Sequence, residues 1–174
     1  IVVSNGHTDS NITELRSNSL YLQPAVLWHN QGNGRFQEAA AAAGSYFDPD
    51  NRHAGRGLVT VDLDNDADHD LVITHIDHTP ALLRNDQSRT LNIDRLQLWL
   101  IGTVSNRDAV GSRVLVRHSD THTTAQQVRA GSSYLSAPDP RQLATRRVPN
   151  PKTPNPNPPG RWNLSGLWTS GVEI

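Results

Sequence analysis

Five aspartates alternate along one short stretch of the chain and form its strongest chemical signal. In VDLDNDADHDLVITH, residues 61 to 75, they are Asp62, Asp64, Asp66, Asp68 and Asp70, and an apolar, β-branched run follows directly. Carboxylates this close repel one another unless a cation lies among them. Alternating carboxylates can surround one hard cation, and Ca²⁺ accepts about six to eight oxygen ligands in flexible geometry. The spacing therefore predicts a calcium site.

The spacing also assigns a role to each aspartate. Side-chain oxygens are expected from Asp62, Asp64, Asp66 and Asp70, and mainly a backbone carbonyl from Asp68. The first half of the loop is spaced like an EF-hand, but Ile73 stands where an EF-hand has a bidentate glutamate. Because the flanking segments read as strands, we expect a calcium loop within a β-hairpin.

One residue of the loop counts against calcium, and two alternatives stay open. Ala67 occupies the sixth position, where a sharp turn usually requires glycine, and a positive φ at alanine costs about 1 kcal/mol. The first alternative is a solvated acidic turn that binds no ion. The second is Mg²⁺, which keeps its waters and demands octahedral geometry. Calcium is the main prediction.

Histidines and serines elsewhere in the chain have simpler explanations than chemistry. His75 and His78, with Asp77 between them, could bind a transition metal, but on a strand this spacing sends the two imidazoles to opposite faces. Ser132 and Ser133 lack the motif that surrounds a hydrolase nucleophile. No catalytic site is predicted, and the chain is not expected to be an enzyme.

Two further groups of residues each allow a structural and a binding role. Asn106, Arg107 and Asp108 could hold a tight loop through hydrogen bonds from side chain to backbone, or could contact a partner. The tryptophans are expected to fill a β core, with a sugar-stacking platform as the alternative. They are Trp28, Trp99, Trp162 and Trp168.

Composition excludes several classes of partner. The 174 residues carry a net charge of −1 and Lys and Arg form no run, so nucleic acid is not an expected partner. A chain without cysteine has no disulfide, thiolate zinc site or cysteine nucleophile. Its apolar stretches are too short to span a membrane. The sequence begins inside an expected strand without a methionine, so we expect it to be part of a longer protein.

Short apolar and period-two runs, bounded by Gly, Asn, Asp and Pro, predict an all-β fold. Strands are expected at 1–4, 25–29, 35–38, 57–61, 71–75, 81–84, 96–101, 112–117 and 124–130. The alanine run at 37–44 is the best helix candidate, with one or two turns that end at Gly44. The proline-rich stretch 149–160 should run over the surface as polyproline II, as a stiff connector or as a peptide ligand.

An internal echo, meaning two pairs of similar segments, occurs in the first half of the chain. IVVSNGH (1–7) resembles LVITHID (71–77), and AVLWHNQGN (25–33) resembles ALLRNDQSR (81–89). Two copies of one supersecondary unit explain this pattern most simply. A strand and the aspartate loop precede the second copy, whereas the first copy lacks them.

These segments resemble two known families. GRGLVTVDLDNDADHDLVITH (55–75), followed by LLRND (82–86), is similar to the FG-GAP or VCBS repeat, which builds blades of integrin-like β-propellers with a calcium loop between the first two strands. HNQGNGRFQEAA (29–40) resembles the end of such a blade. GTVSNRDAVGSRVLVR (102–117) and QQVRAGSSYLSAPDPRQL (126–143) resemble the ASPIC/UnbV domain that often follows these repeats.

The end of the chain fits the second family only in part. LWTSGVEI (167–174) looks like the closing strand of an ASPIC/UnbV domain. Between it and residue 143, however, stands a proline-rich segment where the family usually has a Phe-Gly-Leu-Gly-like strand. The order of the last strands therefore stays open.

Together the resemblances imply a domain organisation and a function. A repeat region of about one and a half blades is expected over 1–94, and an ASPIC/UnbV-like β domain over 95–174. The expected function is that of a non-catalytic, calcium-binding extracellular module for binding, adhesion or assembly, within a larger surface structure or filament. The alternative is an accessory or carbohydrate-binding region of a secreted hydrolase or lectin, with a glycan as ligand.

The first copy of the repeated unit lacks a strand, and this predicts a partner at its edge. A propeller protects its strand edges by closing a ring of blades. The strand expected at residues 1–4 lacks the strand that precedes its counterpart, so its edge should expose unpaired backbone groups. We expect the remainder of a longer chain to cover this edge, ahead of neighbouring copies that would add strands to one another as a homopolymer.

Overall fold

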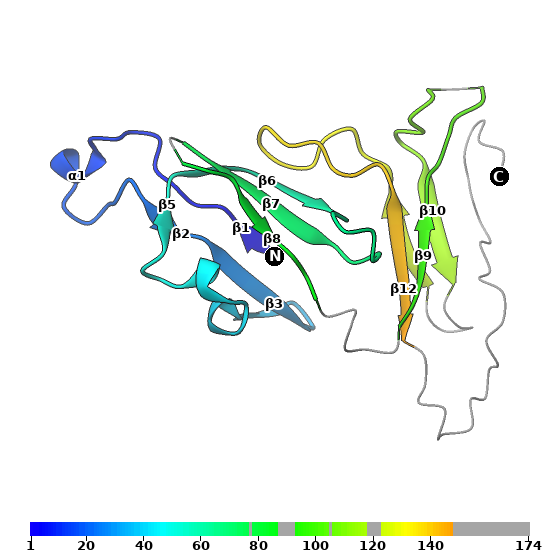
Figure 1. Cartoon of the computed structure of the whole chain (residues 1–174), viewed down its shortest axis with the longest axis horizontal. Coiled ribbons are helices and arrows are strands. Elements are labelled where there is room, and N and C mark those ends of the chain that lie inside the picture. Colours follow the sequence, from blue (N-terminus) through cyan, green and yellow to red (C-terminus); the bar gives the residue numbers. More distant parts are fainter. Residues whose placement is uncertain (77, 87–92, 105, 118–122, 148–174) are drawn as a thin grey trace, which may run out of the picture. The chain divides into compact units, whose positions relative to one another are not determined.

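The chain is all-β, as predicted, and folds into two compact units. The computed structural model describes residues 1–76, 78–86, 93–104, 106–117 and 123–147 (Figure 1). Unit 1 contains residues 1–59, 71–83 and 133–136, and unit 2 contains 60–70, 84–132 and the described residues from 137 on. The aspartate loop thus groups with the C-terminal half of the chain. The predicted boundary at residue 95 stays a prediction.

The regular elements are short. The first eight strands are β1 (Val2–Val3), β2 (Gln23–Pro24), β3 (Val26–Gly32), β4 (Arg35–Glu38), β5 (Arg52–His53), β6 (Gly55–Val61), β7 (Asp70–His75) and β8 (Ala81–Leu83). The remaining described strands are β9 (Ile93–Leu98), β10 (Arg113–Arg117), β11 (Thr123–Gln127) and β12 (Gln142–Arg147). Helical turns occur at α1 (Ile12–Leu15), η1 (Ala40–Ala42) and η2 (Ser45–Phe47), of which the last two are 3₁₀ turns.

Most predicted strands form, and the predicted helix does not. Strand β4 has the bounds 35–38 that the sequence predicts. The alanine run at 37–44 yields only the single 3₁₀ turn η1, because so short a segment cannot repay the cost of nucleating an α-helix. Strand β12, which follows the Asp-Pro-Arg segment at residues 139–141, was not among the predicted strands.

The internal echo corresponds to a repeated strand pair in unit 1. Strand β1 pairs antiparallel with β3, and the echoing β7 pairs antiparallel with β8. The registers differ by one residue, because Val3 lies opposite Val26 whereas its counterpart Ile73 lies opposite Ala81 rather than Leu82. The two copies therefore share a topology without being superimposable residue by residue.

The two sheets that contain these pairs differ in what flanks them. One has the order β6-β7-β8, so β7 lies between two strands. The other has the order β1-β3-β4, so β1 lies at an edge. Ile1 contacts Trp28 through backbone hydrogen bonds on the β3 side, with Trp28 N donating to Ile1 O over 2.7 Å. Among the described strands, β1 pairs with β3, and the missing strand at its other edge stays a prediction.

Unit 1 has a small core. Ala25, Ala40 and Phe47 are buried together, and half-buried side chains from the strands and from η2 pack against them. These are Val2, Leu27, Tyr46, Leu71 and Leu83. Both copies of the repeated strand pair therefore contribute to one apolar cluster, which holds the unit together.

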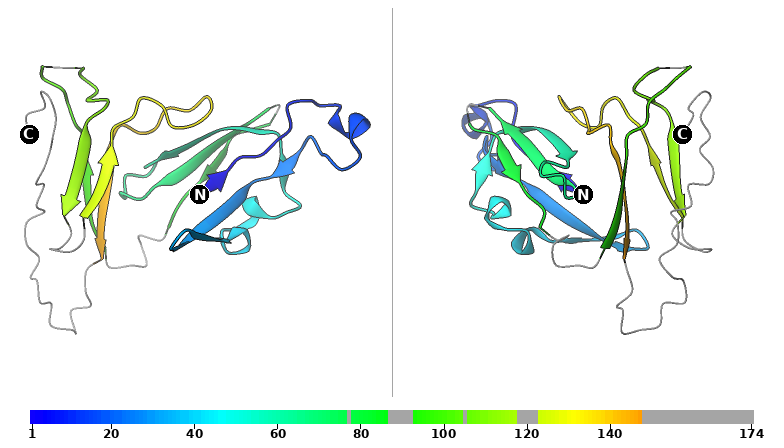
Figure 2. Two further views of the ribbon diagram at one scale, coloured as in Figure 1. Left: turned by 180° about the vertical axis from the view of Figure 1, so that it is seen from behind. Right: turned by 45° about the vertical axis from the view of Figure 1, so that its right-hand side comes forward.

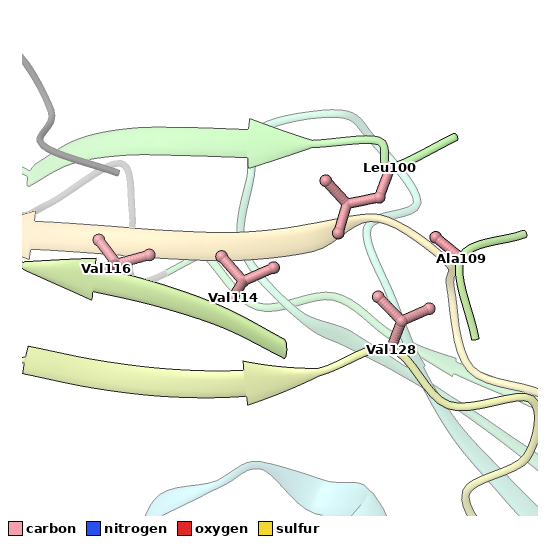
Figure 3. Packing of buried hydrophobic residues seen from close by; sticks show 5 residues of the cluster. All are labelled: Leu100, Ala109, Val114, Val116 and Val128. Atoms are coloured by element: carbon pink, nitrogen blue, oxygen red, sulfur yellow. The ribbon is translucent and has the colours of Figure 1, made fainter. Parts of the chain in front are cut away.

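The described part of unit 2 contains two antiparallel strand pairs. Strand β9 pairs with β12, and β10 pairs with β11 in a hairpin that Figure 2 shows from two further directions. Its core contains Leu100, Ala109, Val114, Val116 and Val128, and Figure 3 shows these side chains gathered between the strands and the loop before β10. Leu96 and Leu98 of β9 pack against this cluster. The core therefore joins the two strand pairs.

The expectation for the tryptophans is wrong where the structure tests it. Trp28 is 37% exposed and Trp99 is 71% exposed, so neither fills the core. Sheets of two or three strands enclose too little volume to bury so large a side chain fully. Trp162 and Trp168 lie outside the described residues, as do the proline-rich stretch 149–160 and the expected closing strand at 167–174.

A search of the described helices finds none with the length and apolar character needed to cross a membrane.

Candidate metal centre

The aspartate loop joins β6 to β7 through a tight turn with two residues in the left-handed region. Asn65 has φ = 58° and Ala67 has φ = 62°. Asparagine tolerates this conformation, whereas alanine brings its Cβ close to the following carbonyl oxygen. The positive φ that the sequence suggested for Ala67 is therefore present, and the loop keeps it despite the steric cost.

Three of the five aspartates meet at one point. Oxygen atoms of Asp62, Asp64 and Asp70 all lie within 4.8 Å of one another. Asp62 is 3% exposed and Asp70 is 0% exposed, whereas Asp64 is exposed. The group therefore has two buried carboxylates at its base and one that faces solvent.

Three backbone amides and the side-chain amide of Gln97 hold the two buried carboxylates in place. Asp70 accepts from Leu63 N at Oδ2 over 2.8 Å and from Asn85 N at Oδ1 over 2.7 Å. Asp62 accepts at Oδ2 from Ala67 N over 3.1 Å and from Gln97 Nε2 over 3.0 Å. These bonds fix the directions of both carboxylates without consuming all their acceptor capacity.

One oxygen in this group is buried and has no hydrogen-bond partner. It is Oδ1 of Asp62. Burying a charged oxygen without a partner is costly, and folded proteins seldom leave one unsatisfied. Hard cations such as Ca²⁺ bind carboxylate oxygens of this kind. The donor set therefore fits a hard cation, with Asp62, Asp64 and Asp70 as the side-chain ligands.

The structure does not bring all five predicted residues to the same point. Asp66 lies outside the group of three and accepts from Asp68 N at Oδ1 over 3.0 Å. Asp68 pairs with Arg95, whose Nε lies 3.4 Å from Oδ1. The Asp68 side chain is thus neutralised by an arginine, which is compatible with the carbonyl role predicted for that residue.

An arginine far along the chain anchors the loop. Arg141 Nη1 donates to Asn65 Oδ1, and Nη2 donates to the backbone oxygen of Asp62, both over 2.8 Å. Arg141 also forms a salt bridge with Asp139. The sequence alone assigned no role to this Asp-Pro-Arg segment, residues 139–141, and only its pairing of opposite charges two residues apart could have drawn attention to it.

Contact with Arg141 lowers the pKa of the Asp139 carboxyl group. Burial alone would raise its pKa, but hydrogen bonds from the side chain and backbone of Arg141, with a further one from the Asp62 backbone, outweigh burial and hold the pKa below 3.8. The same salt bridge raises the pKa of Arg141. Both groups are therefore charged at neutral pH. The aspartate loop is thus held by an arginine that is itself fixed by its ion pair with Asp139.

A second cluster of potential ligands consists of three histidines in unit 1. Ring nitrogens of His53, His75 and His78 lie within 4.8 Å of one another. The expectation that His75 and His78 point to opposite faces is wrong, because β7 ends at His75 and strand alternation does not extend to His78. Strand β5 contributes His53, which was not among the predicted ligands. Asp77 lies outside the described residues.

The surroundings of His53 favour its neutral imidazole. Burial lowers the pKa of His53 below 6.5, and the proximity of His75 and His78 lowers it further. Tyr46 stacks on His53 with a ring separation of 5.4 Å and a tilt of 9°. Burial raises the pKa of Tyr46 to about 12, so its hydroxyl keeps its proton.

The pocket that contains Ser132 also contains a histidine and an aspartate. Ser132 lines an open pocket of about 300 Å³ in unit 2, together with His69 and Asp139. These three residue types could form a hydrolase triad, but Arg141 holds the Asp139 carboxylate. Within the described residues no hydrogen bond joins Ser132 to His69.

The Asn106 loop has the structural role that the sequence allowed for it. Asn106 Oδ1 accepts from Val110 N over 2.8 Å, and Nδ2 donates to Val110 O over 3.1 Å. At Gly102 a Cβ would collide with the carbonyl oxygen of Asn106, so the close approach requires glycine there. Asn106 thus closes the loop that presents Ala109 to the core.

Comparison with known proteins supports one of the two resemblances. Residues 102–144 match the family model described as ASPIC and UnbV, and this match includes Asn106, Asp139 and Arg141. It covers less than half of the chain. FG-GAP and VCBS repeats are not detected. A search of curated proteins returns no match.

Proposed function

We propose that this chain is a non-catalytic, calcium-stabilised extracellular module for binding, adhesion or assembly. The observation that carries the proposal is the buried, unpartnered Oδ1 of Asp62, which lies in the same group as Asp64 and Asp70. A divalent cation would satisfy this oxygen and remove the repulsion among the three carboxylates.

The hydrogen-bond partners of the aspartates favour a hard cation over an empty acidic turn. Asp68 already has a counter-charge in Arg95, whereas Asp62 has only neutral donors at Oδ2. Backbone carbonyls of the loop and water would complete the coordination, since Ca²⁺ tolerates irregular oxygen shells. Mg²⁺ fits less well because it demands near-ideal octahedral geometry.

Thermal unfolding with and without calcium tests the site. An ion that binds only the folded chain stabilises it by about 2.7 kcal/mol at a concentration of one hundred times its Kd. A chelator should therefore lower the melting temperature, and added Ca²⁺ should restore it. An unchanged melting temperature would contradict the proposal.

Two matched variants assign the response to the three carboxylates. Asp64→Asn removes an exposed member of the group and should abolish the calcium-dependent shift without unfolding the chain. Asp68→Asn removes a carboxylate of the same loop that lies outside the group, and the shift should persist. If both variants lose the shift equally, the site is a diffuse acidic patch rather than a defined centre.

The proposal includes a repeat origin for unit 1. The pairs β1–β3 and β7–β8 share antiparallel topology and echo in sequence, which supports two copies of an FG-GAP/VCBS-like unit. In such an arrangement the module would dock through its sheet edges, either to the remainder of a longer chain or to neighbouring subunits.

A carbohydrate-binding role is the second candidate, and the exposure of Trp99 favours it. An indole that is 71% exposed offers a flat apolar face of the kind on which sugar rings stack. Glycan-array binding that Trp99→Ala abolishes would support this role. Absence of binding across the array would leave the non-catalytic assembly module as the function.

A further inference from the structure

We propose that His53, His75 and His78 form a binding site for a divalent transition-metal ion, with Zn²⁺ as the best-matched ion. The site lies in unit 1, belongs to different residues from the aspartate loop and takes a different class of metal. Imidazole nitrogens suit Zn²⁺, Cu²⁺ and Ni²⁺, whereas Ca²⁺ requires oxygen ligands.

The first observation is an orphaned nitrogen. Nε2 of His53 is buried and has no hydrogen-bond partner. Buried polar atoms in folded proteins nearly always find a partner, so an unsatisfied ring nitrogen calls for a ligand. The other two imidazoles of the cluster are close to the His53 ring. The ring centroid of His53 lies 4.4 Å from that of His75 and 5.2 Å from that of His78.

The second observation is the hydrogen bonding of His75, which fixes its tautomer. Nδ1 lies 2.9 Å from the carbonyl oxygen of Thr79, and because a carbonyl can only accept, Nδ1 carries the proton. Nε2 therefore carries the lone pair that could bind an ion. A backbone carbonyl that orients the non-ligating nitrogen is the usual support of a metal-binding histidine.

The third observation is the different exposure of the three rings. His53 and His75 are half-buried, whereas His78 is exposed. Two imidazoles on the inner side and one on the outer side leave a route by which an ion can reach the site from solvent. A fourth coordination position would remain for water, as in zinc sites with three protein ligands.

Tyr46 competes with the ion in the present arrangement. Its hydroxyl lies 2.8 Å from Nε2 of His75 and donates to that lone pair. His53 and His75 are stacked, with a tilt of 22°, so their rings must turn toward one another to share an ion. Removing the Tyr46 hydroxyl should free Nε2 of His75 and let that ring turn. The aromatic ring of Tyr46 that packs beside His53 would be kept.

Zinc titration of the whole chain, purified without a histidine tag, tests the site. Competition with a chromogenic chelator should give one tightly bound Zn²⁺ per chain. His78→Ala should weaken this binding by about tenfold or more, and it should leave the fold intact because the side chain is exposed. Tyr46→Phe should leave the affinity equal or higher.

Matched controls separate this site from other histidines and from the calcium loop. His29→Ala removes an exposed histidine outside the cluster, and the double variant His118→Ala/His122→Ala removes two that lie outside the described residues. Both should retain the ion, as should Asp64→Asn. Binding that survives His78→Ala and His53→Ala, or that disappears with His118 and His122, would overturn the proposal.

Discussion

Arg141 donates a hydrogen bond from Nη2 to the backbone carbonyl oxygen of Asp62 over 2.8 Å, across 79 positions of sequence. This contact ties a residue within the ASPIC/UnbV match to the base of the aspartate loop. Asp62 also carries the buried Oδ1 that has no hydrogen-bond partner. The arginine therefore fixes the backbone of this candidate ligand. The loop and the matched segment therefore form one structural assembly within unit 2.

We expect Arg141→Lys to weaken both stability and calcium binding. The guanidinium bonds Asp139, Asn65 and Asp62 at once, and a single ammonium cannot reproduce that planar fork. A loss of about 1–3 kcal/mol in the free energy of unfolding should result. Chemical denaturation measures the loss, and Arg113→Lys on the exposed face of β10 is the control that should change little. Equal effects from the two variants would contradict the anchor role.

The same ion pair predicts a pH dependence. Because the pKa of Asp139 is lower in the folded chain than its usual 3.8, the group stabilises the fold above that value, and this contribution disappears as pH falls through the folded pKa. Unfolding free energies measured as the pH is lowered should therefore decline more steeply for the natural chain than for Asp139→Asn. Parallel curves for the two proteins would show that the salt bridge adds no pH-dependent stability.

Glycine at position 67 should stabilise the loop. Ala67 holds φ = 62°, a conformation that glycine adopts without steric cost. Relief of this strain, less the entropy that glycine adds to the unfolded chain, predicts a gain of up to about 1 kcal/mol. Calcium affinity should be unchanged or higher, as calorimetry can measure.

Ala109 provides a contrasting control. It also has positive φ, at 51°, but it is only 1% exposed and its methyl group packs in the core of unit 2. Ala109→Gly should therefore leave the free energy of unfolding unchanged or lower, because the loss of core packing offsets the relief of backbone strain. Stabilisation by both substitutions to the same extent would mean that burial plays no part.

A lysine on the edge strand should reduce self-association. Val3 lies in β1 at the edge of its sheet and is 38% exposed, so Val3→Lys places a charge where another strand would add. Light scattering of the 174-residue chain should show less association for this variant. Val104→Lys, at an 85% exposed position in unit 2, adds the same charge away from the edge and is the control. A natural chain that is a well-dispersed monomer with protected amides at residues 1–4 would refute the edge hypothesis.

The sequence by itself determined the class of fold, the position of most strands and the identity of the loop that carries the carboxylates. These properties are local. Alternating apolar residues specify a strand through its period of two, and Asp-rich or Gly-rich turns punctuate the strands. The positive φ of Ala67 could be expected for the same reason, because loop position sets it.

Only the tertiary structure decided which of these groups meet. It separated Asp66 from Asp62, Asp64 and Asp70, brought Arg141 to the loop and placed His53 beside His75 and His78. The end of β7 at His75 removed the alternation on which the sequence-based argument about His78 depended. Sequence periodicity describes one element at a time, whereas a binding site is set by contacts between elements that are distant along the chain.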